Sequence, residues 1–318
     1  MGKILIIGAG AMGSAFSFPC VDNKHEVSII GSPIENNMID ELRKNNFHNS
    51  LDCSLSKSIK FLKANNLQEQ LKNKPDLIVI GVNSKGIDWI SKEIEMATDF
   101  KTPLLLLTKG LTIQNNKFTI LTDKFKNSEI TAVAGPCLAK DLSKKNSTAV
   151  IFANKNIEKA KKISQLIKTN YYFIESSNDL VGIETCAAIK NFYSMIIGSA
   201  KELNSAAFLL HKSIIEMSKF IKLMGGSEKS VYGLAGLGDL YVSSAGGRNS
   251  KMGKYLGEGH TYTQAKNKFM PNDTVEGAEL AFEIGPKILK DIPKKDFPLM
   301  YSLVECLCKD KKYVINFL

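Results

Sequence analysis

The sequence predicts two domains: an α/β domain with a doubly wound parallel sheet, followed by an all-α domain. Up to residue 178, short apolar runs alternate with helical stretches, which is typical of a parallel sheet covered on both faces. From residue 179 onwards there is almost no strand signal. The length of 318 residues also corresponds to about two domains. We therefore expect the domains to cover residues 1–178 and 179–318.

The expected strands are apolar runs with β-branched content, and the helical stretches lie between and after them. The strands are expected at 3–8, 26–30, 76–82, 103–108, 130–135, 148–153 and 171–176. In the first domain, helices are expected directly after GAGAMG and at 36–46, 84–97 and 156–170. In the second domain they are expected at 178–203, with Asn178 or Asp179 as N-cap, and at 206–225, 275–289 and 297–309.

Composition argues against several classes of function. No window approaches 18 uninterrupted apolar residues, so we expect no membrane insertion. The six cysteines form no CxxC pair and the four histidines no HExxH motif, which argues against a disulfide framework and a metal site. The net charge is +10, but only two of the 42 basic residues are arginine. Because nucleic-acid readout favours arginine forks, we expect no nucleic-acid partner. The protein is expected to be cytoplasmic.

A glycine-rich motif opens the first helix. GxGxxG is formed by Gly8, Ala9, Gly10, Ala11, Met12 and Gly13. It lies between the first strand and the first helix, which is the context of a Rossmann-like dinucleotide-binding fingerprint. Gly8 would make the tight turn, Gly10 would let a pyrophosphate approach the backbone, and Gly13 would let the helix pack on the strand. The alternative is a simple tight turn.

The sequence after the second strand does not decide between NAD and NADP. An NAD site usually has an acid at the end of this strand. Here the strand is followed by Gly31 and Ser32, with no acid before Glu35 and no arginine before Arg43. Because nothing basic stands where a 2′-phosphate would bind, the sequence leans weakly towards NAD.

Lys190 is the first candidate catalytic residue. Between Val181 and Ala200 only Glu184 and Lys190 are charged, and a helix so apolar on all sides is buried. Burial lowers the pKa of a lysine, which could then donate a proton near neutral pH. Asp239, in the glycine-rich GLAGLGDL segment, is the expected partner. The alternative is a lysine whose ammonium group extends out of the core.

Arg248 and Asn249 follow two glycines and form a candidate anion clamp, because an arginine fork suits phosphate or carboxylate. The alternative is a surface turn. Lys109 follows the strand at 103–108, and the segment Gly135 to Ala139 follows the strand at 130–135. Both would lie at the carboxyl edge of the sheet, where α/β proteins bind ligands.

Together these segments resemble the NAD(P)-dependent glycerol-3-phosphate dehydrogenase family. GAGAMG, TKG, AGPCLA, AAIKN, GLAGLGDL, GGRN and VEG occur in the family's order, between residues 8 and 277. The resemblance implies that Lys190 is the catalytic lysine. It implies substrate contacts from Lys109, Gly135, Asp239, Arg248 and Asn249, and cofactor contacts from Ala139, Arg248 and Glu276. Where this chain has Cys137 the family usually has serine, and where it has Gly31-Ser32 the family often has an aromatic or basic residue.

The expected function is the reduction of dihydroxyacetone phosphate to sn-glycerol 3-phosphate with NAD or NADP, for phospholipid synthesis. Lys190 would donate the proton, Asp239 would orient Lys190, and Arg248, Asn249 and Lys109 would hold the phosphate. The site is expected between the two domains. One alternative is a ketopantoate-reductase-like or hydroxyacid dehydrogenase of similar fold. Another is a catalytically silent dinucleotide-binding regulator. The oligomeric state is left open, with a homodimer as one possibility.

Overall fold

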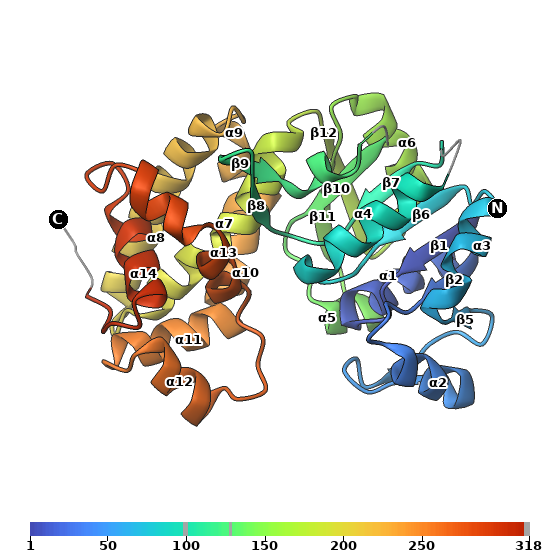
Figure 1. Cartoon of the computed structure of the whole chain (residues 1–318), viewed down its shortest axis with the longest axis horizontal. Coiled ribbons are helices and arrows are strands. Elements are labelled where there is room, and N and C mark those ends of the chain that lie inside the picture. Colours follow the sequence, from blue (N-terminus) through green and yellow to red (C-terminus); the bar gives the residue numbers. More distant parts are fainter. Residues whose placement is uncertain (98–100, 127–128, 315–318) are drawn as a thin grey trace. The chain divides into compact units, whose positions relative to one another are not determined.

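The computed structural model describes residues 1–97, 101–126 and 129–314 (Figure 1). The chain forms two compact units. The first comprises Met1–Lys109 and Leu121–Leu180, and the second comprises Gly110–Ile120 and Val181–Leu318. The first is an α/β unit and the second is mostly helical, so the expected fold class is confirmed.

An eight-stranded sheet forms the centre of the α/β unit. Its strands are β1 (Lys3–Ile7), β2 (Glu26–Ile30), β5 (Lys60–Leu62), β6 (Leu77–Ile80), β7 (Leu104–Leu106), β10 (Ile130–Ala134), β11 (Thr148–Ala153) and β12 (Tyr172–Ser177). Their spatial order is β12-β11-β10-β7-β6-β1-β2-β5. The strand order reverses between β1 and β6, and such a reversal leaves a crevice at the carboxyl ends of the strands where ligands bind.

The sheet is parallel as expected, except at one pair of neighbouring strands. β10 pairs with β11 in the antiparallel sense, whereas β11 and β12 are parallel to each other. The connection from β10 to β11 contains only the five-residue helix α5 (Ala139–Ser143). Such a helix rises about 7.5 Å, whereas the five residues of β10 span about 16 Å. The connecting helix is therefore too short to return the chain to the start of β10.

Helices cover both faces of the sheet, and side chains alternate between the two faces along each strand. On one face Ile4 and Ile6 pack in a cluster with residues of α1 (Ala11–Asp22), α2 (Asn36–Asn45), α5 and α6 (Ile157–Ile167). On the other face Leu5 and Ile7 pack with residues of α3 (Leu67–Lys72) and α4 (Ile87–Met96). This alternation fixes the register of β1, and therefore the position of the glycine-rich loop that follows it.

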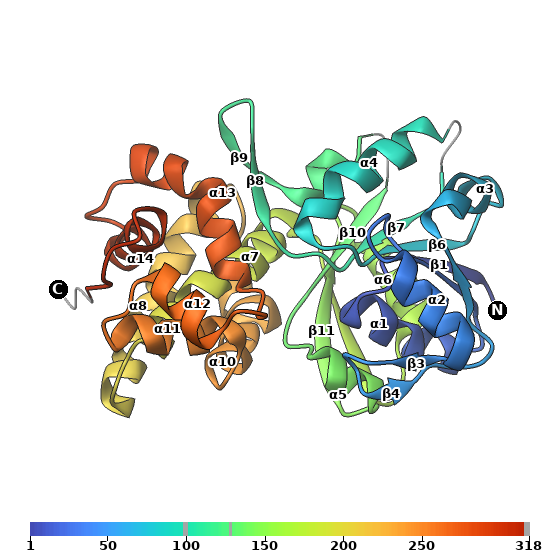
Figure 2. The same cartoon turned by 60° about the horizontal axis from the view of Figure 1, so that its bottom comes forward.

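A β-hairpin inserted in the α/β unit's sequence belongs to the helical unit. Its strands are β8 (Leu111–Gln114) and β9 (Lys117–Ile120), drawn in green in Figure 2. Asn115 and Asn116 form the turn and both have positive φ, which asparagine tolerates better than most residues. Phe118 packs edge-on against Phe220, with ring centroids 5.6 Å apart. This hairpin was not expected from the sequence.

The helical unit is built from eight α-helices within the described residues. These are α7 (Leu180–Gly198), α8 (Leu203–Leu223), α9 (Lys229–Tyr232), α10 (Asp239–Ser244), α11 (Arg248–Gly257), α12 (Tyr262–Phe269), α13 (Glu276–Asp291) and α14 (Pro298–Cys308). α9 to α12 were not expected, because they are short and are separated by segments that contain glycine. Among the described residues α7 is long and apolar enough to cross a membrane, but 94% of its most apolar window is buried inside the structure.

A buried carboxylate joins three helices of this unit. Glu216 of α8 accepts hydrogen bonds from the backbone N–H groups of Leu299 and Met300, at 2.8 and 3.0 Å, in the first turn of α14. It also accepts one from the Tyr193 hydroxyl of α7 at 3.2 Å. Burial raises the pKa of Glu216 above its ordinary value, and the hydrogen bonds oppose this only in part.

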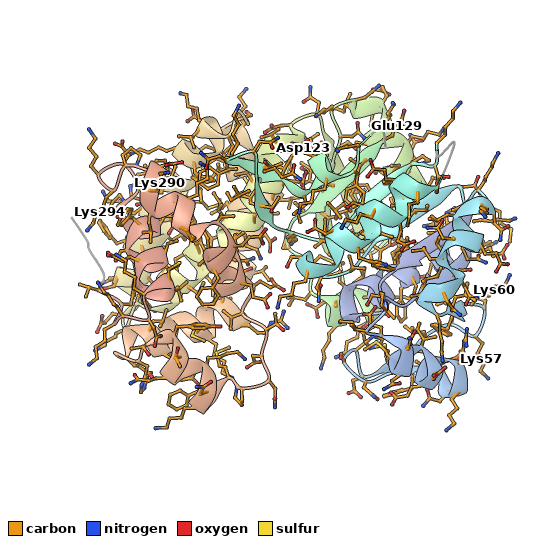
Figure 3. The ribbon with its side chains drawn as sticks, in the orientation of Figure 1. Lys57, Lys60, Asp123, Glu129, Lys290 and Lys294 are labelled. Atoms are coloured by element: carbon orange, nitrogen blue, oxygen red, sulfur yellow. The ribbon has the colours of Figure 1, made fainter. Side chains whose placement is uncertain are left out.

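Charged side chains are spread over both units. Figure 3 labels Lys57, Lys60, Asp123 and Glu129 in the α/β unit, and Lys290 and Lys294 in the helical unit. Asp123 lies 4.0 Å from Lys155, and Glu129 forms an ion pair with Lys159. Some lysines are thus paired with neighbouring acids, and the absence of a nucleic-acid partner stays a prediction.

Candidate active site

The glycine-rich loop forms a cradle at the carboxyl end of β1. Gly8 has a φ of +110°, and a Cβ there would lie 2.6 Å from the backbone of Gly81, which follows β6. A Cβ on Gly13 would lie 2.2 Å from the carbonyl oxygen of Gly8. Both positions therefore require glycine, one for the turn and one for the approach of α1 to β1. A Cβ on Gly10 would meet only the Glu35 carboxylate, at 3.6 Å.

This cradle fits a dinucleotide cofactor. α1 begins at Ala11 with Gly10 as its N-cap, so the first N–H groups of the helix have no acceptor within it. These groups and the helix dipole suit the pyrophosphate anion. The space beside Gly10 lets the anion approach the backbone. The cofactor would supply the hydride, and Ala11, Met12 and Gly13 would bind its pyrophosphate.

Three side chains that were not expected to belong to the site hold this loop. Glu35 Oε2 accepts hydrogen bonds from the backbone N–H groups of Ala9 and Ser32, at 3.2 and 2.7 Å. On the other side, the Ala9 carbonyl oxygen lies 2.9 Å from Ser14 Oγ and 3.0 Å from Nε2 of the buried His48. The only signal of Glu35 in the sequence was its place as the first acid after β2. His48 had none, because its contact joins segments far apart in the chain.

A buried ion pair forms the centre of the second group of candidate residues. Lys190 and Asp239 are only 6% and 3% exposed, and Lys190 Nζ lies 2.8 Å from Asp239 Oδ1. Lys190 also donates a hydrogen bond to Ser243 Oγ, one turn after Asp239 on α10. The structure therefore brings the two expected residues together and adds Ser243. Lys190 does not extend out of the core.

The glycine-rich segment before Asp239 is helical. Residues Leu234–Gly238 form a π-helix that continues directly into α10. Glycines allow this tight path, and π-helical turns occur often at functional sites. Ser194 of α7 donates a hydrogen bond to the Ser243 carbonyl oxygen at 2.9 Å. α10 is thereby fixed to α7 beside Lys190.

Asn249 is held at the start of α11. It is 7% exposed, and its Nδ2 donates to Asn191 Oδ1 at 3.0 Å. Its Oδ1 accepts from the Gly277 N–H at 2.9 Å. Asn191 follows Lys190 on α7, so Asn249 ties the starts of α11 and α13 to the helix that carries the lysine. Asn191 is a further residue that the sequence analysis did not assign to the site.

Arg248 lies at the first position of α11 and is half exposed. Its Nη2 forms an ion pair with Glu276 Oε1 at 3.0 Å, and the two side chains are 54% and 50% exposed. The structure thus joins two residues that the sequence analysis gave to the cofactor. It shows that Arg248 begins a helix and is not part of a surface turn. A guanidinium has five N–H donors, so a single hydrogen bond to Glu276 leaves donors for an anion.

The other expected residues lie in the α/β unit, after the carboxyl ends of β7 and β10. Lys109 Nζ donates to the Gly135 carbonyl oxygen at 3.2 Å. Gly135 has a φ of +114°, and the chain then passes Cys137 and begins α5 at Ala139. Cys137 is of intermediate exposure. Lys109 and Gly135, inferred from two separate strand ends, are therefore in contact.

Comparison with known proteins places the chain in one family. The model of the NAD-dependent glycerol-3-phosphate dehydrogenase N-terminus matches residues 3–160, and that of the C-terminus matches residues 179–315. A glycerol-3-phosphate dehydrogenase [NAD(P)+] of Mesoplasma florum is 30% identical over 320 residues, covering 95% of this chain and 93% of the relative. An NADP(+)-dependent glycerol-3-phosphate dehydrogenase of Archaeoglobus fulgidus is 29% identical over 309 residues, covering 91% of each chain.

The fold is shared with solved structures. The crystal structure of glycerol-3-phosphate dehydrogenase from Coxiella burnetii superposes with a TM-score of 0.86 at 23% identity, covering 98% of this chain and 96% of that one. The two family models between them cover both units, and neither describes a ketopantoate reductase. The chain therefore belongs to the NAD-dependent glycerol-3-phosphate dehydrogenase family.

Proposed function

We propose that this protein interconverts dihydroxyacetone phosphate and sn-glycerol 3-phosphate with a nicotinamide dinucleotide. The observation that carries the proposal is the buried Lys190–Asp239 ion pair within a chain of this family. A buried ammonium group is costly unless paired, and a silent regulator needs no such group. The names of the relatives point to the same reaction.

Lys190 is the proton donor in this proposal. A dinucleotide held by Ala11, Met12 and Gly13 would supply the hydride for C2 of dihydroxyacetone phosphate. As C2 is reduced, Lys190 Nζ donates a proton to the carbonyl oxygen, so that no free alkoxide forms. Asp239 and Ser243 fix the position of Nζ through their hydrogen bonds. An ammonium group held in a buried site stabilises the developing negative charge more strongly than water does.

Arg248 and Lys109 are the proposed ligands of the substrate phosphate. This role of Arg248 is supported by the exposure of its side chain and by the N–H donors that the ion pair with Glu276 leaves available. Lys109 is supported by its place after a strand end, beside Gly135. Asn249 is assigned a substrate contact by its place beside Arg248 in the sequence and by the family resemblance. The structure shows it holding Asn191 and the start of α13, so we propose that it positions α11 as well.

The cofactor contacts proposed outside the glycine-rich loop are Ala139, Arg248 and Glu276. Ala139 begins α5 and Glu276 begins α13. The proposed setting is the cytoplasm, where sn-glycerol 3-phosphate would enter phospholipid synthesis. We propose neither a nucleic-acid partner nor insertion into a membrane. Assembly as a homodimer is kept as a proposal.

Oxidation of NADH and NADPH tests the proposed function. The purified protein is mixed with dihydroxyacetone phosphate, dihydroxyacetone, ketopantoate or a panel of 2-keto acids, and absorbance is followed at the nicotinamide band. We expect rapid oxidation with dihydroxyacetone phosphate alone, and sn-glycerol 3-phosphate as the product. Preferential turnover of ketopantoate or a 2-keto acid contradicts the proposal. Cofactor binding without turnover of any of these compounds supports a regulator instead.

A further inference from the structure

A carboxylate lies against the glycine-rich loop although β2 has no acid at its end. The chain after β2 turns back at Ser32, whose carbonyl oxygen accepts a hydrogen bond from the Glu35 N–H at 2.9 Å. Gly31 makes this turn possible, because a Cβ there would lie 2.7 Å from Ile39 Cγ1 and 3.3 Å from Glu35 Cβ. Glu35, the residue that precedes α2, thus lies beside the end of β2.

The two oxygens of this carboxylate have different surroundings. Oε2 accepts from the N–H groups of Ala9 and Ser32, so its position is fixed. Oε1 lies 3.6 Å from the point where a Cβ of Gly10 would stand. Within the described part of the chain, no hydrogen bond to Oε1 is found. Glu35 is partly exposed, so this oxygen remains available to a ligand that passes Gly10.

This is the place where a dinucleotide-binding domain holds the adenosine ribose. In such domains an acid about 20 residues after the glycine-rich motif accepts hydrogen bonds from the ribose hydroxyls, whereas NADP sites have a basic residue nearby for the 2′-phosphate. Glu35 follows Gly13 at about this separation and contacts the loop itself.

Two basic side chains have partners of their own. Arg43 lies near Glu35 in the sequence, and Lys63 follows the neighbouring strand β5. Lys63 lies 2.7 Å from Asp40 in an ion pair. Arg43 Nε donates to the Phe61 carbonyl oxygen at 2.8 Å. The charge held directly on the glycine-rich loop is therefore negative.

We propose that Glu35 accepts hydrogen bonds from the ribose hydroxyls of NAD(H) and that its charge excludes the 2′-phosphate of NADP(H). The inference rests on the proposed function only in requiring that the cradle bind a nicotinamide dinucleotide. This role of Glu35 would make the enzyme selective for NAD(H), although one relative is named for NADP(+). Glu35 replaces the acid that is missing at the end of β2.

Equilibrium binding without substrate tests the inference, with the fluorescence of the reduced nicotinamide as readout. For the wild type we expect NADPH to bind at least about 30-fold more weakly than NADH, because like charges brought into contact at a binding site repel each other. The analogue 2′-deoxy-NADH is expected to bind about tenfold more weakly than NADH, since it lacks one hydrogen bond to a charged acceptor.

Glu35→Gln removes the charge and keeps a neutral acceptor. We expect it to reduce the preference for NADH over NADPH by about tenfold or more, and to remove most of the difference between NADH and 2′-deoxy-NADH. Glu35→Asp keeps the charge and is expected to keep the exclusion of NADPH to within about threefold. Glu41→Gln is the matched control. It is an exposed glutamate of α2, and its binding constants should match the wild type.

Any of three results overturns the inference. The wild type binds NADH and NADPH with equal affinity, Glu35→Gln loses affinity for both cofactors by the same factor, or the wild type binds 2′-deoxy-NADH as tightly as NADH. If Glu35→Gln fails to fold, the binding constants of the wild type and of Glu35→Asp for NADPH and 2′-deoxy-NADH still test the inference. Failure of the proposed function is distinct. Tight binding of NADH without turnover of dihydroxyacetone phosphate refutes the proposed reaction and leaves the role of Glu35 intact, whereas no dinucleotide binding refutes both.

Discussion

Replacing Lys190 with methionine tests the proposed chemistry and the buried ion pair together. The Lys190 and Asp239 side chains are 8% and 5% exposed, so the variant leaves a buried carboxylate without its cation. Breaking a buried pair in this way costs about 3–5 kcal/mol of unfolding free energy. Loss of a general acid reduces turnover by about 10²–10⁴-fold. We therefore expect a destabilised, nearly inactive protein that still binds its cofactor.

The two effects can be separated with a double variant. Lys190→Met with Asp239→Asn removes both charges, and we expect it to regain about 2 kcal/mol or more of the lost stability while turnover stays low. Unfolding free energies come from urea titration, and turnover from NADH oxidation with dihydroxyacetone phosphate. Lys219→Met, at an exposed position of α8, is the control and should change neither quantity appreciably. Turnover of Lys190→Met within threefold of the wild type, or recovery of activity in the double variant, would refute the role of Lys190.

Three further predictions concern the cradle, the phosphate and the buried carboxylate. Gly10→Val should fold normally, because a side chain there meets only Glu35, but it should abolish NADH binding by filling the pyrophosphate space; unchanged NADH fluorescence titration would mean that the loop is only a turn. Arg248→Lys should lower kcat/KM for dihydroxyacetone phosphate by about 30- to 1,000-fold and leave the slow reaction of dihydroxyacetone nearly unchanged; an equal loss for both substrates would assign Arg248 to the cofactor or the fold. Glu216 has a folded pKa above its ordinary value of 4.5, so its contribution to stability is complete below about pH 4.5 and is lost as pH rises through the folded pKa. The unfolding free energy of the wild type minus that of Glu216→Gln, from urea titrations between pH 4 and 7, should therefore fall as pH rises, and a rise would refute the assignment.

The fold class was readable from the sequence because local patterns carry it. Continuous apolar runs such as those of β6 and β7 specify buried strands whatever their partners are. GxGxxG after β1 specifies a turn that few other sequences can make. By contrast, the three-residue edge strand β5 and the hairpin β8–β9 carry weak local signals. The direction of β11 is also invisible locally, since strand pairing depends on the length and path of the connection.

The candidate site was readable from the sequence only in part. Lys190 was inferred because a charge within an apolar helix is costly, and Asp239 because an acid stood alone among glycines. Which atoms meet was decided by the tertiary structure. Packing of α10 on α7 adds Ser243 to the pair, and α11 brings Asn249 to Asn191. These contacts join residues about 50 to 60 positions apart, which no periodicity encodes.

The sequence by itself determined the two kinds of unit, the glycine-rich cradle and the place of a lysine within an apolar helix. Each depends on a local physical requirement: alternation of apolar runs, a backbone with positive φ, or the cost of a buried charge. Only the tertiary structure decided that Glu35 and His48 hold Ala9 from opposite sides. Those two side chains come from α2's N-terminal turn and from β3 (Phe47–His48). Their contacts follow from how the chain turns back after β2, and that path is set by packing.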